Sequence, residues 1–219
     1  NRERCDVGLK KQQGIQSVKF EEPPIICAAA SVVGQKEGDG PFGDVFDQIE
    51  SDPKVGGDTW EDAEGRLQER AAELAIQKAG CGKEAIRYIV AGDLLGQLMA
   101  SSFGLAGFDK PLFGVYGACS TMGESIGIGS MLVEGGFADY VLAMTSSHFA
   151  SAEKQFRFPL GYANQRPKAS TWTVTGSGAV VICKGDQKQG MAKITGITTG
   201  KIVDYGVKDT MNMGACMAP

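Results

Sequence analysis

Apolar runs of strand length alternate with helical patterns along most of this chain, and this alternation constrains the fold more than any other feature. The runs cover residues 25–30, 88–91, 112–116, 140–145, 179–183 and 193–198. The middle runs are continuously apolar, which is typical of strands that are covered on both faces. The alternation therefore predicts an α/β fold with a mostly parallel sheet.

The clearest helical pattern covers residues 60–79. Its apolar positions repeat at steps of three and four residues and form one stripe, made of Trp60, Ala63, Leu67, Ala71, Leu74 and Ala75. Thr59 and Asp62 resemble a capping pair, and Gly80 provides a stop. The charged residues between them are expected to be largely solvated: Glu61, Glu64, Arg66, Glu69 and Arg70. Further helices are expected over residues 95–105 and from just after Cys119.

One segment, residues 147–171, interrupts the alternation because it has no clear period. It contains Pro159 and Pro167 together with several cationic and aromatic side chains. A loop of this length in a compact domain usually serves a function or forms an interface, and both interpretations stay open.

Composition and charge exclude several classes of function. Of the 219 residues, 42% are hydrophobic, which suffices for a full core, and the net charge of −4 comes without a basic stripe. Nucleic acid is therefore not an expected partner. No apolar run approaches the roughly 20 residues of a membrane span, and residues 1–16 are too polar for a signal peptide. We expect a soluble, intracellular protein, with attachment to a membrane through a partner left open.

The six cysteines, at positions 5, 27, 81, 119, 183 and 216, form neither a CxxC pair nor a zinc-ligand cluster with the single histidine. Their scatter suits free thiols in a reducing compartment. We expect neither a metal site nor a cofactor.

The main candidate site is a sharp strand-to-helix turn at Cys119. An apolar strand leads into a glycine turn, and Thr121 and Glu124 form a T-x-x-E capping box that predicts a helix start at Thr121. The helix is rich in glycine and serine, which indicates close approach of neighbouring backbone and burial. A thiol at the positive end of a helix dipole is favoured as a thiolate nucleophile, but cysteine is equally a small buried apolar residue.

Two further candidates follow apolar strands. Asp93 and His148 each stand where a predicted strand ends, which is where ligands bind in open α/β sheets. The alternatives are a turn or helix-capping aspartate and a solvated loop histidine.

Several longer motifs carry a family resemblance. They are GQKEGDGPFG at residues 34–43, AGDLL at 91–95, YGACSTMGES at 116–125, TSSHFASAEKQFRFP at 145–159 and WTVTGSGAV at 172–180. The turn at Cys119 resembles the thiolase and ketoacyl-synthase superfamily, and the longer motifs resemble the stage V sporulation protein AD family over about residues 8–219. Residues 1–7 fall outside the match and are expected to be an appended tail.

The resemblance implies a thiolase-like fold of which this chain carries the N-terminal βαβαβ half, a buried Cys-bearing helix and the beginning of the second half. The superfamily's enzymes take acid–base His and Cys residues from the second half, which is expected to be missing here. The family is tied to loading dipicolinic acid into the developing spore, together with membrane proteins of the same operon. The resemblance also implies a homodimer and a place at the spore inner membrane.

The favoured hypothesis is therefore a non-catalytic protein that binds dipicolinic acid, free or as its calcium chelate. The ligand-binding residues expected are Cys119, Ser120, Asp93, His148, Arg157 and Arg166. Two alternatives stay open. One is an acyl-transfer or condensing enzyme with Cys119 as nucleophile, and the other is a scaffold that docks membrane partners through residues 147–171.

Overall fold

The computed structural model describes residues 11–94, 96–156, 172–185 and 191–209, which belong to two compact units. One unit draws on residues 1–19 and 196–219, and the other comprises residues 20–195. The proposed tail at residues 1–7 lies outside the described residues.

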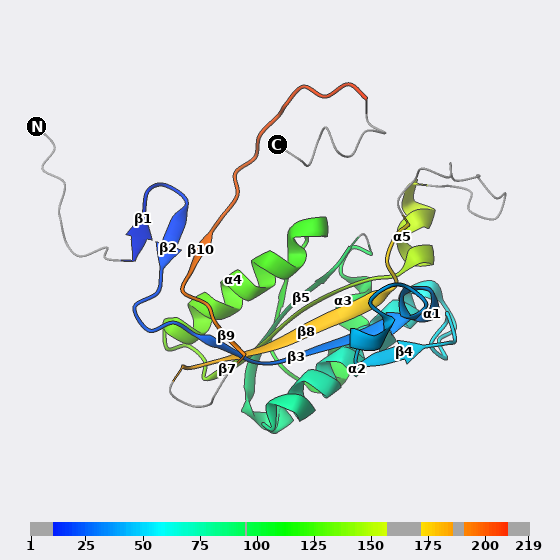
Figure 1. Cartoon of the computed structure of the whole chain (residues 1–219), viewed down its shortest axis with the longest axis horizontal. Coiled ribbons are helices and arrows are strands. Elements are labelled where there is room, and N and C mark those ends of the chain that lie inside the picture. Colours follow the sequence, from blue (N-terminus) through cyan, green and yellow to red (C-terminus); the bar gives the residue numbers. More distant parts are fainter. Residues whose placement is uncertain (1–10, 95, 157–171, 186–190, 210–219) are drawn as a thin grey trace, which may run out of the picture. The chain divides into compact units, whose positions relative to one another are not determined.

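The larger unit is built on one seven-stranded sheet (Figure 1). Its strands are β3 (Ile25–Gly34), β4 (Gln48–Glu50), β5 (Ile86–Asp93), β6 (Leu112–Gly114), β7 (Tyr140–Ser147), β8 (Gly176–Cys183) and β9 (Ala192–Lys193). The order is β4-β3-β8-β7-β5-β6, and β9 pairs with β3. Strands β3 to β7 run in one direction, whereas β8 and β9 are antiparallel to their neighbours. The predicted α/β fold with a mostly parallel sheet is confirmed.

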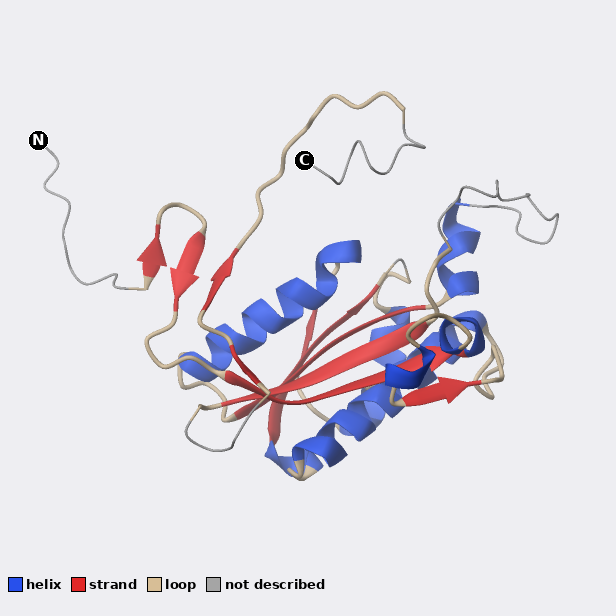
Figure 2. Cartoon of the chain, viewed as in Figure 1, coloured by secondary structure: helices blue, strands red, loops and turns tan. Residues whose placement is uncertain are grey.

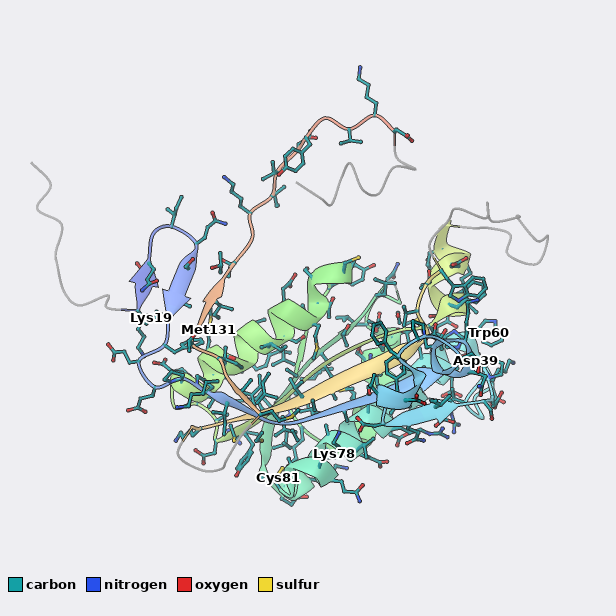
Figure 3. The ribbon with its side chains drawn as sticks, viewed as in Figure 1. Lys19, Asp39, Trp60, Lys78, Cys81 and Met131 are labelled. Atoms are coloured by element: carbon teal, nitrogen blue, oxygen red, sulfur yellow. The ribbon has the colours of Figure 1, made fainter. Side chains whose placement is uncertain are left out.

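The helices cover both faces of this sheet (Figure 2). They are α1 (Gln35–Gly38), α2 (Trp60–Ala79), α3 (Met99–Gly104), α4 (Thr121–Glu134) and α5 (Phe149–Phe156), with short 3-10 turns at η1 (Gly43–Val45), η2 (Lys83–Ala85), η3 (Ala106–Phe108) and η4 (Ala118–Ser120). Figure 3 shows Met131 of α4 and Lys78 of α2 on opposite sides of the sheet. Each side has its own apolar cluster, so the sheet separates two cores.

Helix α2 confirms the prediction for residues 60–79. The Asp62 amide donates to Thr59 Oγ1 at 3.1 Å, and Gly80 ends the helix with a left-handed φ of 60°. Of the predicted apolar face, Ala63, Leu67, Ala71 and Ala75 are buried, whereas Trp60 and Leu74 are partly buried. One assignment was wrong: Glu64, expected to be solvated, is only 1% exposed. The periodicity of apolar residues does not identify a polar residue on the buried face of a helix. Such a residue is recognised only through its hydrogen-bond partners, and those of Glu64 lie far along the chain.

Helix α4 packs with one side on β5, β7 and β8. Gly129 allows this close packing, because a Cβ there would lie 3.0 Å from Ile182 Cδ1 and 3.2 Å from Val141 Cγ1. The predicted burial therefore holds on the sheet side. On its other side Gly123, Glu124 and Met131 are exposed.

Three other sequence expectations need correction. Residues 147–171 are not all loop: β7 extends to Ser147, and α5 follows, although at eight residues it is too short to show a period. The helix expected over residues 95–105 is confined to α3. The run 193–198 is not one strand, because β9 and β10 (Gly196–Thr198) belong to different sheets.

The smaller unit contains a three-stranded antiparallel sheet. Strand β2 (Ser17–Lys19) lies between β1 (Gln12–Gln13) and β10. The pairing joins residues about 180 positions apart, as in the hydrogen bond between Ser17 Oγ and Thr198 Oγ1 at 2.8 Å.

Candidate functional site

A cavity of about 350 Å³ opens where β3 and β7 end and β8 begins. Its apolar lining comes from Val33, Phe46, Leu94, Ala118, Met122 and Val174, and its remaining lining from Ser31, Cys119, Thr145, Ser146, Ser147, Gly176, Ser177 and Gly178. Two hollows of about 410 and 480 Å³ share the segment Asp109–Pro111 near the other end of β5. The cavity at Cys119 is the better candidate, because ligands of α/β sheets bind at the carboxyl ends of the strands.

Cys119 lies in this cavity at the turn that joins β6 to α4. The preceding residue, Ala118, adopts a left-handed φ of 48°, which costs a non-glycine residue on the order of 1–2 kcal/mol. The turn also closes tightly over β5: the Val115 amide donates to Ala91 O at 2.8 Å, and a Cβ at Gly92 would overlap the Val115 carbonyl oxygen. Cys119 itself is exposed, so the turn holds a free thiol toward the cavity.

The helix begins at Thr121 as predicted, but the predicted capping box was wrong. Ser120 precedes the helix, and its hydroxyl lies within hydrogen-bond distance of Gly117 O, at 2.8 Å, and of the Glu124 carboxylate. Thr121 is instead the first helical residue, with its hydroxyl buried and without a partner in the described structure. A local S-x-x-x-E contact thus replaces the T-x-x-E box, and Ser120 does not line the cavity.

Asp93 is fully buried beside the cavity, not in its lining. One carboxylate oxygen accepts from the Leu98 amide at 3.1 Å, and the other accepts from the amide and hydroxyl of Ser101 at 3.1 and 3.0 Å. These bonds anchor the turn after β5, where Gln97 and Leu98 have left-handed φ values of 54° and 65°. Asp93 therefore shapes the segment that carries Leu94 into the cavity wall.

His148 is also buried, with 2% of its surface exposed, and it does not line the cavity. Its Nε2 lies 2.8 Å from Pro53 O, and its Nδ1 accepts from the Ala150 amide at 3.1 Å, which fits a neutral ring protonated at Nε2. Burial lowers the pKa of His148 below its ordinary value of 6.5. Its ring packs 5.5 Å from that of Trp60, which Figure 3 labels at the start of α2.

Arg157 and Arg166 lie outside the described residues. Lys154, a third cation in this part of the sequence, forms an ion pair with Glu61 of α2. The structure thus brings Cys119 to the cavity and places Asp93 and His148 in the framework beneath it.

Sequence reasoning missed a buried polar network under the same strand ends. Ser146 Oγ donates to Glu64 Oε1 at 2.7 Å and accepts from Gln68 Nε2 at 2.6 Å. Gln68 also donates to Ser101 Oγ at 3.0 Å, which links the network to Asp93. The one signal available in the sequence was the spacing of Glu64 and Gln68, which are one helical turn apart, on the same side as Leu67 and Ala71.

The environment of Glu64 favours its protonated form. Burial raises the pKa of Glu64 from 4.5 to about 7, and the negative charges of Asp93 and Glu61 act in the same direction. Hydrogen bonds from Ser151 and Ser146 oppose this shift. Glu64 is therefore a titratable group near the cavity that changes its charge close to neutral pH.

Within the described residues, no group of three or more His, Cys, Asp or Glu side chains is arranged to hold a metal ion. The same part of the chain contains no helix that is both long and apolar enough to cross a bilayer.

A mostly parallel sheet between two helical layers, with a cysteine at the start of a glycine-rich helix, is the arrangement of a thiolase-like fold. The fold is similar to that of 3-oxoacyl-[acyl-carrier-protein] synthase III from Aquifex aeolicus, with a TM-score of 0.51 and 17% identity over 75% of this chain and 55% of that one. The chain belongs to the stage V sporulation protein AD family, whose sequence profile matches residues 14–219.

A curated relative carries the same family name. Stage V sporulation protein AD of Bacillus subtilis (strain 168) is 43% identical over 209 residues, which are 95% of this chain and 61% of the relative. The chain thus spans less than two thirds of the length of this relative. The chain therefore belongs to a family of sporulation proteins.

Proposed function

We propose that this protein binds dipicolinic acid and supports its uptake into the developing spore without catalysing a reaction. The observation that carries the proposal is the cavity at Cys119, which forms at the carboxyl ends of the strands in a sporulation protein. Its volume of about 350 Å³ falls in the range of small-molecule pockets, about 300–1,000 Å³.

The lining of the cavity suits a flat aromatic dianion. Leu94, Met122 and Val174 offer apolar surface to a ring. The positive end of the α4 dipole lies at Cys119, where it favours a carboxylate. In this proposal Arg157 and Arg166 supply the charge-assisted hydrogen bonds that a second carboxylate requires. Asp93 and His148 contribute by holding the wall segments in place.

Isothermal titration calorimetry with dipicolinate tests the proposal. Cys119→Ala and Arg157→Ala should each weaken binding, whereas Cys81→Ala, a partly buried thiol at the far end of α2 (Figure 3), serves as the control. Unchanged affinity in both variants would refute this assignment of the site. The same titration with calcium present decides whether the ligand is the free acid or its chelate.

A second candidate is acyl transfer through Cys119. The favouring observation is that this thiol is exposed, lines the cavity and stands at a helix start. Iodoacetamide should then alkylate Cys119 well before the other thiols, and an acyl-CoA should leave its acyl group on it. Uniform slow labelling without acyl transfer would exclude this activity.

We also propose a homodimer paired through β6. This strand is an edge of the sheet, and its Leu112 and Phe113 side chains are 37% and 43% exposed. An unpaired edge that carries apolar side chains is suited to pairing with another strand. Sedimentation analysis should give a dimer for the parent chain and a monomer for Phe113→Lys; a parent monomer at high concentration would contradict the pairing.

The remaining partners proposed are membrane proteins of the same sporulation operon, which would hold the protein at the spore inner membrane. A pull-down with those proteins, with and without residues 157–171, tests whether this segment docks them. Equal capture by both forms would remove residues 157–171 from the docking surface and leave only residues 147–156 of the proposed segment 147–171.

A further inference from the structure

Two side chains of α2 support the strand ends from the face of the sheet opposite to Cys119. Glu64 and Gln68 both bond to the hydroxyl of Ser146, the penultimate residue of β7. The three side chains are at most 5% exposed, so water does not compete for these bonds. The two side-chain hydrogen bonds from α2 to the end of β7 therefore meet at a single hydroxyl group.

Ser146 joins this support to the cavity. Its hydroxyl points toward α2, while the residue itself borders the cavity. Its carbonyl oxygen accepts from the Leu94 amide at 3.0 Å, and Leu94 lines the cavity as well. A displacement of Ser146 would therefore move two parts of the cavity wall.

The hydrogen bonds around Glu64 can be completed in both protonation states. When Glu64 is ionised, the hydroxyls of Ser146 and Ser151 both donate to its carboxylate. When Glu64 is protonated, it can donate to Ser151 Oγ, because the Ser151 hydroxyl has another acceptor in His148 O at 3.1 Å. The bond that changes lies between α2 and the first turn of α5.

The charged groups around Glu64 come from several elements. Asp93 of β5 and Glu61 of α2 act on it with negative charge. On α5, Lys154 is paired with Glu61, and Glu153 is buried. The nearby His148 ring has its own hydrogen bonds to Pro53 and Ala150.

We propose that Glu64 is a positioning residue for the Cys119 cavity: its carboxyl group accepts the hydrogen bond from Ser146 in both protonation states, and its bond to Ser151 of α5 reverses direction when it gains or loses a proton. The consequence for the ligand, which rests on the proposed function, has a definite sign. An ionised Glu64 below the cavity repels a dianion, so dipicolinate should bind more tightly when Glu64 is protonated. If binding raises the pKa of Glu64 by one unit, affinity differs about tenfold between the two states.

The first test needs no ligand. Amide NMR spectra of the 219-residue chain are recorded between about pH 5.5 and pH 8.5, the interval around the pKa of Glu64. The amides of Leu94, Ser146, Ser147 and Ser151 should share one titration midpoint near 7, which Glu64→Gln abolishes because glutamine is a neutral counterpart of the protonated acid. Glu61→Gln, on the same helix, is the control and should retain the titration. Flat amide shifts in the parent chain, or a titration that persists in Glu64→Gln, would overturn the proposal.

The second test is dipicolinate calorimetry over the same pH interval. The parent chain should lose roughly tenfold in affinity from low to high pH, whereas Glu64→Gln should keep the low-pH affinity throughout. The two tests separate the possible failures. A parent chain that titrates at Ser146 but binds no dipicolinate at any pH refutes the proposed function alone, and equal pH dependence in parent and variant refutes the role of Glu64.

Discussion

The carboxylate of Glu64 on α2 accepts a hydrogen bond of 2.7 Å from the hydroxyl of Ser146 at the end of β7, although the two residues are 82 positions apart. This bond places an ionisable group with a pKa of about 7 directly below the strand ends that form the cavity. Its effects on stability can be measured separately from any effect on ligand binding.

Glu64→Gln should make the protein more stable at high pH. The pKa of Glu64 rises from 4.5 to about 7 on folding, so the native state holds a proton that the unfolded chain has lost between these values. The stabilising contribution of this group is complete below about pH 4.5 and disappears as the pH rises through about 7, a change on the order of 3 kcal/mol. Urea unfolding at several pH values should show that the free energy of unfolding of the variant rises relative to that of the parent up to about pH 8. Equal free energies of unfolding at about pH 8 would contradict the raised pKa of Glu64.

His148 should titrate abnormally, in the opposite sense to Glu64. Burial lowers the pKa of His148, so below pH 6.5 the unfolded chain binds a proton more readily than the native state does. His148 therefore lowers the free energy of unfolding as the pH falls below 6.5. His148 is the only histidine in the chain, so its ring signal in a proton NMR titration needs no assignment. The midpoint should lie below 6.5, and a midpoint at or above that value would show that the ring is solvated.

Asp93→Ala should destabilise the turn after β5. The substitution leaves the partly buried amide of Leu98 and the buried amide of Ser101 without their acceptor, at a cost of roughly 3 kcal/mol. Hydrogen exchange should accelerate at those two amides before it changes elsewhere. Asp44→Ala, at an exposed aspartate, should stay within about 0.5 kcal/mol of the parent. Unchanged exchange in Asp93→Ala would show that this carboxylate does not anchor the turn.

Two glycines of α4 should respond in opposite ways to alanine. A Cβ at Gly123 would meet nothing within 4 Å, so Gly123→Ala should stabilise the chain by up to about 1 kcal/mol through helix propensity. A Cβ at Gly129 would press on Ile182 and Val141, and overpacking of about 1–3 kcal/mol should outweigh that gain. Thermal unfolding of the two variants provides the comparison; a stabilised Gly129→Ala would mean that α4 does not press on the sheet there.

Much of the fold could be predicted because its signals are local. The stripe of α2, its Thr59 cap and its Gly80 stop predicted the helix bounds of residues 60–79. Continuous apolar runs identified the central strands and hence the sheet. Helix α5 escaped prediction because eight residues are too few to show a period, and the run at residues 193–198 misled because strand propensity does not tell which sheet a strand joins.

The candidate site was predictable only in part. The glycine turn before α4 identified Cys119, and the structure places this thiol in the cavity. Strand ends also suggested Asp93 and His148, but position along a strand does not reveal the direction of a side chain. Both turn into buried hydrogen bonds: Asp93 accepts from Leu98 and Ser101 in the turn that follows it, and His148 bonds to Pro53, which lies 95 positions away.

By itself, the sequence determined the alternation of strands and helices and the length of α2, because helix periods, caps and apolar runs act between near neighbours. The tertiary structure alone decided that Glu64 is buried, that Ser146 connects it to Gln68, and that Cys119 shares a cavity with the ends of β3 and β7. The physical reason is that these buried polar groups are stable only when residues from distant parts of the chain complete their hydrogen bonds. Those residues come together only when the sheet is assembled.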